Sequence, residues 1–157
     1  HNALAECTVP IIVALERYAI NGGAAYALAG DLLVAGETAW IQVGEVIQGL
    51  PAPMNMAWLT LRHSPAVASR LLFTGERIAA PDLLAMSVAH RVVADDSVRA
   101  EAESLAQRIA GSPPGSARGA KAALRQLYGH DPVAQITRAR ELMPVRGTFR
   151  PTAAPKN

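Results

Sequence analysis

Cysteine, aromatic residues and long hydrophobic runs are all scarce in this chain of 157 residues. A single cysteine, Cys7, excludes an internal disulfide, which suits a reducing compartment. No apolar run approaches the roughly 20 residues of a membrane span, and the longest extends only from Ala24 to Ala29. Residues 1–8 have neither the basic start nor the apolar stretch of a signal peptide. We therefore expect a cytoplasmic protein with no membrane partner.

Charge of either sign is also limited. The formal net charge is +2, and no basic run is interleaved with aromatic residues, so nucleic acid is not an expected partner. The residues His63, His90 and His130 are scattered without the spacing of metal ligands, and we expect no metal site. Half of the residues are hydrophobic, which favours a folded core over disorder. The length allows one domain or a piece of a larger one.

The first third of the chain reads as strands around one short helix. The run from Pro10 to Leu15 is apolar, rich in β-branched residues and too short for a helix, which predicts a buried parallel strand. Asn21-Gly22-Gly23 interrupts it, and residues 24–29 favour a helix that is apolar all round and hence buried. Residues 32–35 and 39–43 predict two further strands.

Helices dominate the remainder. Residues 49–55, with two prolines, predict a loop. Apolar periodicity and break residues predict helices over 66–73, 81–86, 97–110, 116–128 and 131–143, with a short strand over 90–93. In the last helix Asp131 is the expected N-cap, followed by Pro132 at the first helical position. The tail after Pro144 is expected to be extended or mobile.

The strand, Gly-Gly and short helix together have two readings. Glycines allow close backbone approach at such a turn, and a helix N-terminus offers unpaired N–H groups to an anion or a polarised oxygen. The pattern is equally that of an ordinary packing turn, and it is not a dinucleotide-binding fingerprint. From these residues alone both readings stay open.

The order of several short motifs resembles the crotonase (enoyl-CoA hydratase/isomerase) superfamily. The motifs are Val9–Ala14, Tyr18–Gly23, Leu28–Asp31, Ala35–Ala39, Gly44–Val46, Gly49–Pro51 and Leu72–Ala80, and the resemblance extends to about Leu127. It implies an α/β fold, with a crotonase-like ββα spiral core followed by a C-terminal helical region. We place the core at residues 1–93 and the helical, oligomerising region at residues 94–157.

Family members are typically about 260 residues long, and this chain resembles only their second part. The resemblance implies that the N-terminal half of the spiral is absent. That half would also hold one of the two backbone N–H donors for the thioester oxygen. We therefore expect that these 157 residues alone do not form a stable monomer, since the strand beginning at Pro10 would present an unpaired edge.

The resemblance assigns two catalytic groups to this chain. Gly22 matches the glycine whose N–H is the second donor to the thioester oxygen, and such donors stabilise an enolate more than the neutral thioester. Glu45 matches one of two catalytic glutamates, a proton carrier if burial holds its pKa near the working pH. Without the resemblance, Glu45 reads as one exposed acid among 13 acidic residues.

The second catalytic glutamate is missing, because Ala25 stands at its position. A hydration that needs two acids to hold water is therefore not expected. Relatives with one carboxylate include double-bond isomerases, hydratase-lyases of phenylpropenoyl-CoAs and some acyl-CoA decarboxylases; we rank an isomerase first. The neighbouring Tyr26 offers a hydroxyl, but core packing is the favoured interpretation.

Two further segments depart from the family. Residues 52–56 replace a Gly-rich loop that ends in Thr, and their methionines and Trp58 either line the acyl pocket or pack beneath it. Ser87 stands where most relatives have glycine at a helix end; a left-handed backbone there would cost about 1 kcal/mol. Asp31 matches a structural carboxylate. The predicted substrate-binding residues are Gly23, Ala25, Tyr26, Pro51, Met54 and Trp58.

The implied partner is an acyl-CoA thioester, which is the substrate, so no separate cofactor is expected. Crotonases are commonly trimers or hexamers joined through their last helices, so a homotrimer or hexamer is expected here. Basic residues gather near the end of the chain, where they either meet CoA phosphates or form a solvated basic tail: Arg138, Arg140, Arg146, Arg150 and Lys156. The alternative function is a non-catalytic acyl-CoA-binding or assembly protein that keeps only the fold.

Overall fold

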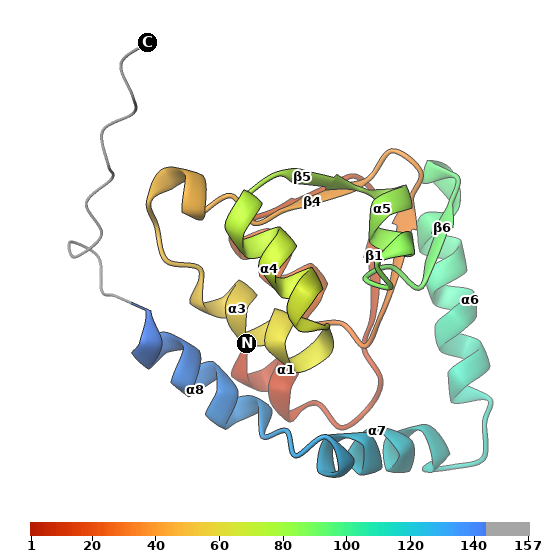
Figure 1. The fold of residues 1–157 in the computed structure, drawn as a ribbon. Coiled ribbons are helices and arrows are strands. Elements are labelled where there is room, and N and C mark those ends of the chain that lie inside the picture. Colours follow the sequence, from red (N-terminus) through yellow and green to blue (C-terminus); the bar gives the residue numbers. More distant parts are fainter. Residues whose placement is uncertain (144–157) are drawn as a thin grey trace, which may run out of the picture.

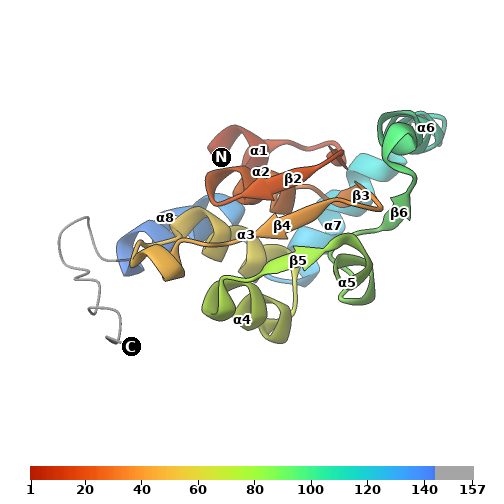
Figure 2. The same ribbon diagram turned by 90° about the horizontal axis from the view of Figure 1, so that it is seen from above.

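Two small sheets form the frame of the computed structural model, which describes residues 1–143. The first sheet contains the parallel strands β1 (Ile12–Leu15), β3 (Leu32–Gly36) and β6 (Arg91–Val93), in the order β1-β3-β6. The second contains β2 (Tyr18–Ile20), β4 (Trp40–Gln42) and β5 (Arg77–Ala79), with β5 antiparallel to β4. Figure 2 shows β2, β4 and β5 side by side. Strands β1 and β2 each lie at an edge of their sheet.

Strand β3 is a continuous apolar run because both of its faces are buried. Its side chains alternate between two cores: Leu33 and Ala35 belong to the main core, and Val34 belongs to a second cluster beneath α6. A strand covered on both faces has no exposed face for polar residues. The predicted buried parallel pairing of the first two apolar runs is confirmed, with Ile12 opposite Leu32.

Helices surround the sheets (Figure 1). They are α1 (Asn2–Glu6), α2 (Gly22–Leu28), α3 (Pro53–Arg62), α4 (Pro65–Thr74), α5 (Ala80–Ala85), α6 (Val98–Ala110), α7 (Ser116–Leu127) and α8 (Pro132–Leu142), with single 3-10 turns at Val46–Gln48 and Asp95–Ser97. Figure 1 shows α6, α7 and α8 following one another along the outside of the molecule.

The last three helices differ in what they bury. Ile136 and Ala139 of α8 join the main core against α3, and α6 covers the second cluster. In α7 only Lys121 is buried. The apolar stripes of α6 and α8 are therefore covered by this chain itself, whereas Leu124 and Leu127 of α7 stay exposed. The proposed division of the chain at residue 93 remains a prediction.

Several elements differ from the sequence prediction. The expected loop over residues 49–55 is wrong in its second half, because α3 begins at Pro53. Proline fits the first turn of a helix, where its missing N–H has no partner in any case. Strands β2 and β5 and helix α1 were not predicted. The N-cap of α8 is confirmed: the Asp131 carboxylate accepts from the N–H groups of Val133 and Ala134.

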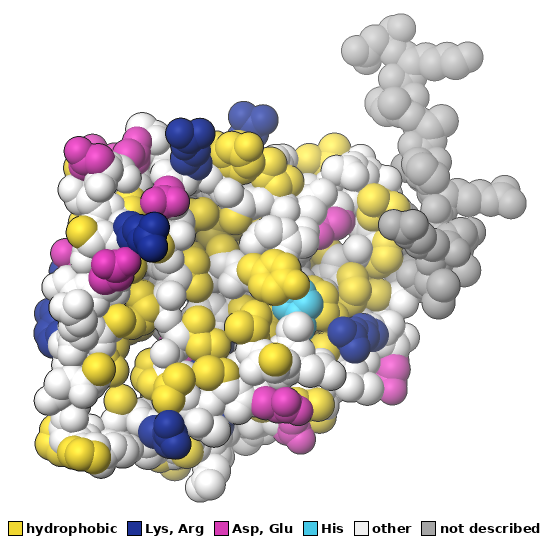
Figure 3. Space-filling view, turned by 180° about the vertical axis from the view of Figure 1, so that it is seen from behind, with side chains coloured by type: hydrophobic (Ala, Val, Ile, Leu, Met, Phe, Trp, Pro, Cys, Tyr) yellow, Lys and Arg dark blue, Asp and Glu magenta, His cyan; other side chains and the backbone are white. Residues whose placement is uncertain are grey.

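The surface of the described part is mixed. Figure 3 shows hydrophobic side chains spread over much of the face seen from behind. Large exposed hydrophobic residues include Tyr18, Ile20 and Tyr26. Among residues 1–143, no helix has the length and apolar character to cross a membrane. The predicted extended tail after Pro144 lies outside the described residues.

Candidate active site

The turn between β2 and α2 has an unusual backbone. Asn21 takes φ 50° and ψ −115°, and Gly22 is already the first helical residue. The Asn21 N–H donates to the carbonyl of Gln42 at 2.9 Å, which fixes the turn to β4. Asparagine tolerates positive φ better than most residues, so the tight turn survives without glycine at this position.

The N-terminus of α2 is left uncapped. The first intrahelical bond joins the N–H of Ala25 to the Asn21 carbonyl at 3.1 Å, so the N–H groups of Gly22 and Gly23 precede the helical ladder. The Asn21 side chain does not cap them; its Oδ1 accepts from the Gly44 N–H at 2.9 Å. A Cβ added at Gly22 or Gly23 would meet no atom of the described residues within 4 Å, its chain neighbours and helix backbone aside. Open space beside these two glycines and N–H groups outside the helical ladder are two features of an oxyanion site.

Glu45 follows β4 and turns inward. The residue is 9% exposed, and its Oε1 accepts from the Asn55 side-chain N–H at 2.9 Å. The other oxygen, Oε2, is buried and has no hydrogen-bond partner among the described residues. Burial raises the pKa of Glu45, and hydrogen bonds from its own backbone N–H and from Asn55 offset this only partly. The interpretation of Glu45 as an ordinary exposed acid is therefore wrong.

Asn55 joins the acid to the turn. Its Nδ2 also donates to the Asn21 carbonyl at 3.0 Å, and the residue is 1% exposed. Sequence reasoning gave Asn55 no role. The available signal is that it is the only strongly polar side chain in the run from Pro51 to Leu59, and a buried polar group needs partners.

Other predicted site residues lie in different surroundings. Ala25 and Trp58 are fully buried, and both are core residues without surface for a ligand in this structure. The expectation that Tyr26 packs in the core is wrong: it is 60% exposed and stacks on the His1 ring at 4.6 Å between centroids. Helix α2 has seven residues and one side against solvent. Residue 26 lies on that side, away from the buried alanines. The Trp58 indole N–H donates to His1 Nδ1 at 3.0 Å.

The remaining predicted positions are less defined by contacts. Pro51 and Met54 are half-buried, and Arg140 Nη2 of α8 lies 3.9 Å from the Met54 sulfur. Arg138 pairs with Glu141, while the other basic tail residues, Arg146, Arg150 and Lys156, lie outside the described part. Ser87 has φ 59°, so its backbone is left-handed, the condition under which serine at this position costs about 1 kcal/mol.

The volume of a cleft does not identify the candidate site. An open cleft of about 970 Å³ lies at the corner between β1 and β2, lined by Glu16, Tyr18, Trp40 and Asp95 among others. None of the residues around Glu45 and Gly22 lines it. Within residues 1–143, we take Glu45 as the candidate site, where a buried acid, an uncapped turn and the amide that both share come together.

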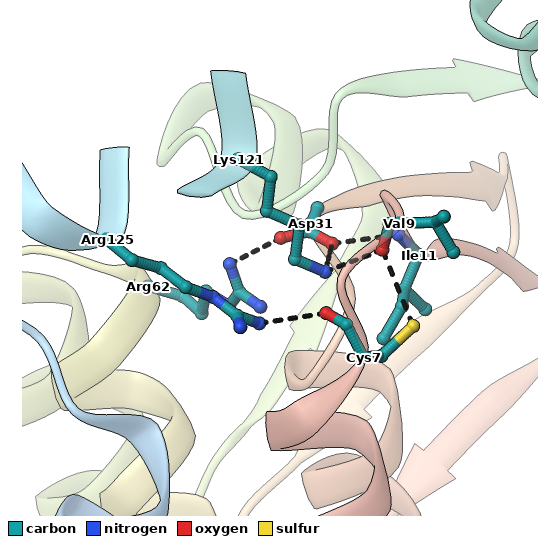
Figure 4. Close-up of polar contacts among 7 residues, drawn as sticks. All are labelled: Cys7, Val9, Ile11, Asp31, Arg62, Lys121 and Arg125. Carbon is teal, nitrogen blue, oxygen red and sulfur yellow. Dashed lines mark hydrogen bonds and ion pairs between the residues drawn. The ribbon is translucent and has the colours of Figure 1, made fainter. Parts of the chain in front are cut away.

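Asp31 lies in a separate cluster, shown in Figure 4. Its carboxylate pairs with Lys121 at 2.6 Å and Arg62 at 2.5 Å, and accepts from the Ile11 N–H at 2.8 Å. Lys121 also donates to the carbonyl of Val9. The predicted structural role of Asp31 is confirmed, since these bonds tie α7 and α3 to β1. Across residues 1–143, no group of three or more His, Cys, Asp or Glu side chains is placed to hold a metal ion.

Comparisons with known proteins show the family of the chain. The family model for enoyl-CoA hydratase/isomerase matches residues 1–146. A probable enoyl-CoA hydratase of Mycobacterium tuberculosis is 32% identical over 88% of this chain and 54% of its own length. A carnitinyl-CoA dehydratase of Proteus mirabilis is 33% identical over 80% of this chain and 47% of its own.

A solved structure shows the same fold. The enoyl-CoA hydratase/isomerase of Pseudoalteromonas atlantica superposes with a TM-score of 0.80 at 27% identity, over 90% of this chain and 58% of that one. The chain thus spans about half the length of the curated relatives it matches.

Proposed function

Because the chain belongs to the enoyl-CoA hydratase/isomerase family, we propose that it acts on acyl-CoA thioesters by proton transfer next to the thioester, with Glu45 as its acid–base group. The observation that carries this proposal is the placement of Glu45: a buried carboxylate, one oxygen unpaired, linked through a single amide to the turn that presents the Gly22 N–H.

Each group has a distinct part in the reaction. Oε2 of Glu45 removes a proton from the carbon next to the thioester, and the electron pair moves to the thioester oxygen. The Gly22 N–H, outside the helical ladder, donates to that oxygen and stabilises the enolate more than the neutral ester. Burial raises the pKa of Glu45 and so makes the acid a stronger base once it is ionised.

One carboxylate is enough for a double-bond isomerisation. Glu45 would take a proton from C2 of a 3-enoyl thioester and return it to C4, which leaves a 2-enoyl thioester with no net loss of atoms. This reaction is our first choice because Ala25 supplies no second acid. A lyase or decarboxylase, in which Glu45 protonates the enolate after carbon–carbon cleavage, follows closely.

These reactions share a proton transfer at the carbon next to the thioester, and this step provides the test. We expect the protein to exchange the α-protons of butyryl-CoA with D2O, followed by proton NMR, and Glu45→Gln to slow this exchange by 10²- to 10⁴-fold. The amide keeps the shape of the acid but carries no transferable proton. Equal rates for wild type and Glu45→Gln would overturn the proposal, and incubation with 3-hexenoyl-CoA would separate an isomerase from the other reactions.

Assembly is proposed on the same basis. Helix α7 and its C-cap expose Leu124, Leu127 and Tyr128, which residues 1–143 leave uncovered. Exposed apolar side chains of this kind commonly mark contact surfaces. We propose a homotrimer or hexamer in which a neighbouring subunit covers α7, and light scattering of the native protein tests it. A fully active monomer at micromolar concentration would contradict the assembly.

A further inference from the structure

Within the described part of the chain, the Asn55 side chain bonds to both parts of the candidate site. It lies in the first turn of α3, and its Nδ2 donates to the Asn21 carbonyl at 3.0 Å and to Glu45 Oε1 at 2.9 Å. Both partners are acceptors, so the amide nitrogen, and not the oxygen, must face them. The two hydrogens of one NH₂ group thereby join the turn before Gly22 to the acid.

We propose that Asn55 is the positioning residue of this site, which holds Glu45 against the Asn21–Gly22 turn and leaves Oε2 as the oxygen that transfers the proton. The inference rests on the proposed function. A carboxylate with one oxygen fixed and the other free has a single direction in which to deliver or accept a proton, and this directionality is what a reaction with one acid requires.

The bonds that are not made support this role. Glu45 Oε2 and Asn55 Oδ1 are both buried and have no partner among the described residues. Buried polar atoms in a purely structural network are normally satisfied, and unpaired ones carry a cost in stability. Nε of Arg62 and Nε of Arg125 are likewise unpaired in the Asp31 cluster, so the role rests on the combination at Glu45, where one oxygen is held by Asn55 and the other is unbonded.

The residue type at position 55 is specific to this geometry. Aspartate would add a second carboxylate beside Glu45 and has no N–H to donate. Alanine would leave Glu45 Oε1 and the Asn21 carbonyl without their shared donor. Asn55 lies in residues 52–56, one of the segments that depart from the resembling family.

The test measures α-proton exchange of butyryl-CoA in D2O as a function of pH. For Asn55→Ala we expect kcat to fall 10- to 100-fold with KM changed less than threefold. The acid limb of the kcat/KM profile should move to higher pH, because a hydrogen bond that stabilises the carboxylate is lost. Asn55→Gln should recover part of the rate, and Gln48→Ala, which truncates an exposed amide three residues after Glu45, should match wild type.

A second measurement separates failure of this inference from failure of the proposed function. The carboxyl carbon of Glu45, identified by its absence in Glu45→Gln, is titrated by ¹³C NMR in wild type and in Asn55→Leu, which is close to asparagine in size and adds no charge. Positioning predicts a higher Glu45 pKa in the variant, whether or not butyryl-CoA is exchanged. An unchanged Glu45 titration, or a lost rate without any shift of the pH profile, would overturn the role of Asn55.

Discussion

Two polar networks in this chain, around Asp31 and around Glu45, differ in the groups that their carboxylates meet. Around Asp31, one carboxylate meets two cations and a backbone N–H, and Lys121 reaches a carbonyl as well. Around Glu45, one carboxylate meets a neutral amide, and an oxygen of each group is left without a partner. The first network pairs opposite charges, although Nε of Arg62 and Nε of Arg125 are unpaired there too, whereas the second holds its carboxylate with a neutral donor. Removing an acid should therefore have opposite consequences in the two places.

Loss of the Asp31 carboxylate should have the largest effect on stability. In Asp31→Ala the buried ammonium of Lys121 and the guanidinium of Arg62 lose their counter-charge. Breaking a buried pair from one side typically costs 3–5 kcal/mol, so we expect the free energy of unfolding to fall by about that amount in urea titrations. The control is Glu37→Ala, which removes an exposed acid and should change the value by less than about 0.5 kcal/mol.

Lys121→Met should cost less. Methionine keeps most of the buried stem, and Asp31 retains Arg62 and the Ile11 N–H. We expect a loss of about 1–2 kcal/mol, and a double variant with Asp31→Ala that is less destabilised than the sum of the two. Strict additivity of the two losses would show that the ion pair is not a coupled unit.

Glu45→Gln should change stability in the opposite direction, and in a pH-dependent way. Because burial raises the pKa of Glu45, the folded state holds its proton more tightly than the unfolded state. Stability is then lost as the pH rises from the ordinary value of 4.5 towards the raised pKa, by at most about 1.4 kcal/mol per pH unit. The glutamine variant does not titrate, so its advantage over wild type should grow through this window. Parallel stability–pH curves would show that Glu45 titrates normally.

Gly22→Ala should have the smallest effect on stability. The added methyl group meets nothing in the chain, and alanine favours a helix, so the free energy of unfolding should stay within about 1 kcal/mol of wild type. Exchange of butyryl-CoA α-protons should nevertheless slow, because the methyl group occupies the space left for the acyl group. In Gly30→Ala the Cβ would lie 2.6 Å from Val13 Cγ2, and this variant should instead unfold more easily. A stable and fully active Gly22→Ala would remove the glycine from the site.

The sequence predicted those elements whose pattern is local. Strands β1 and β3 are apolar runs, and α6 and α8 carry apolar stripes with the period of a helix, so each can be predicted from its own residues. Strands β2 and β5 have three residues each and are defined by the partners they bond, which no local pattern records. Pro53 was taken as a loop signal because the same residue either interrupts a helix or opens one.

The candidate site divides in the same way. Gly22 and Glu45 were identified through motifs that a family shares, whereas periodicity and composition gave neither of them a function. Asn55 was missed because its importance depends on a carbonyl 34 residues earlier, which only the packing of α3 on α2 brings within reach. Tyr26 was misplaced because the period of a short, alanine-rich helix does not show which side faces solvent.

The pairing of the strands has a consequence for how the chain tolerates change in its length. Ile12 aligns with Leu32 in one sheet while Tyr18 aligns with Trp40 in the other, so a single pass of the backbone sets the register of both. One residue inserted or deleted between Asn21 and Asp31 would turn β3 and β4 together, so that β3 exchanges the residues of its two cores and the buried Ile41 of β4 turns to the other face. We therefore expect natural variants of this segment to differ by replacement, and length variation to gather in the connections after β6, since within residues 1–143 no strand follows it.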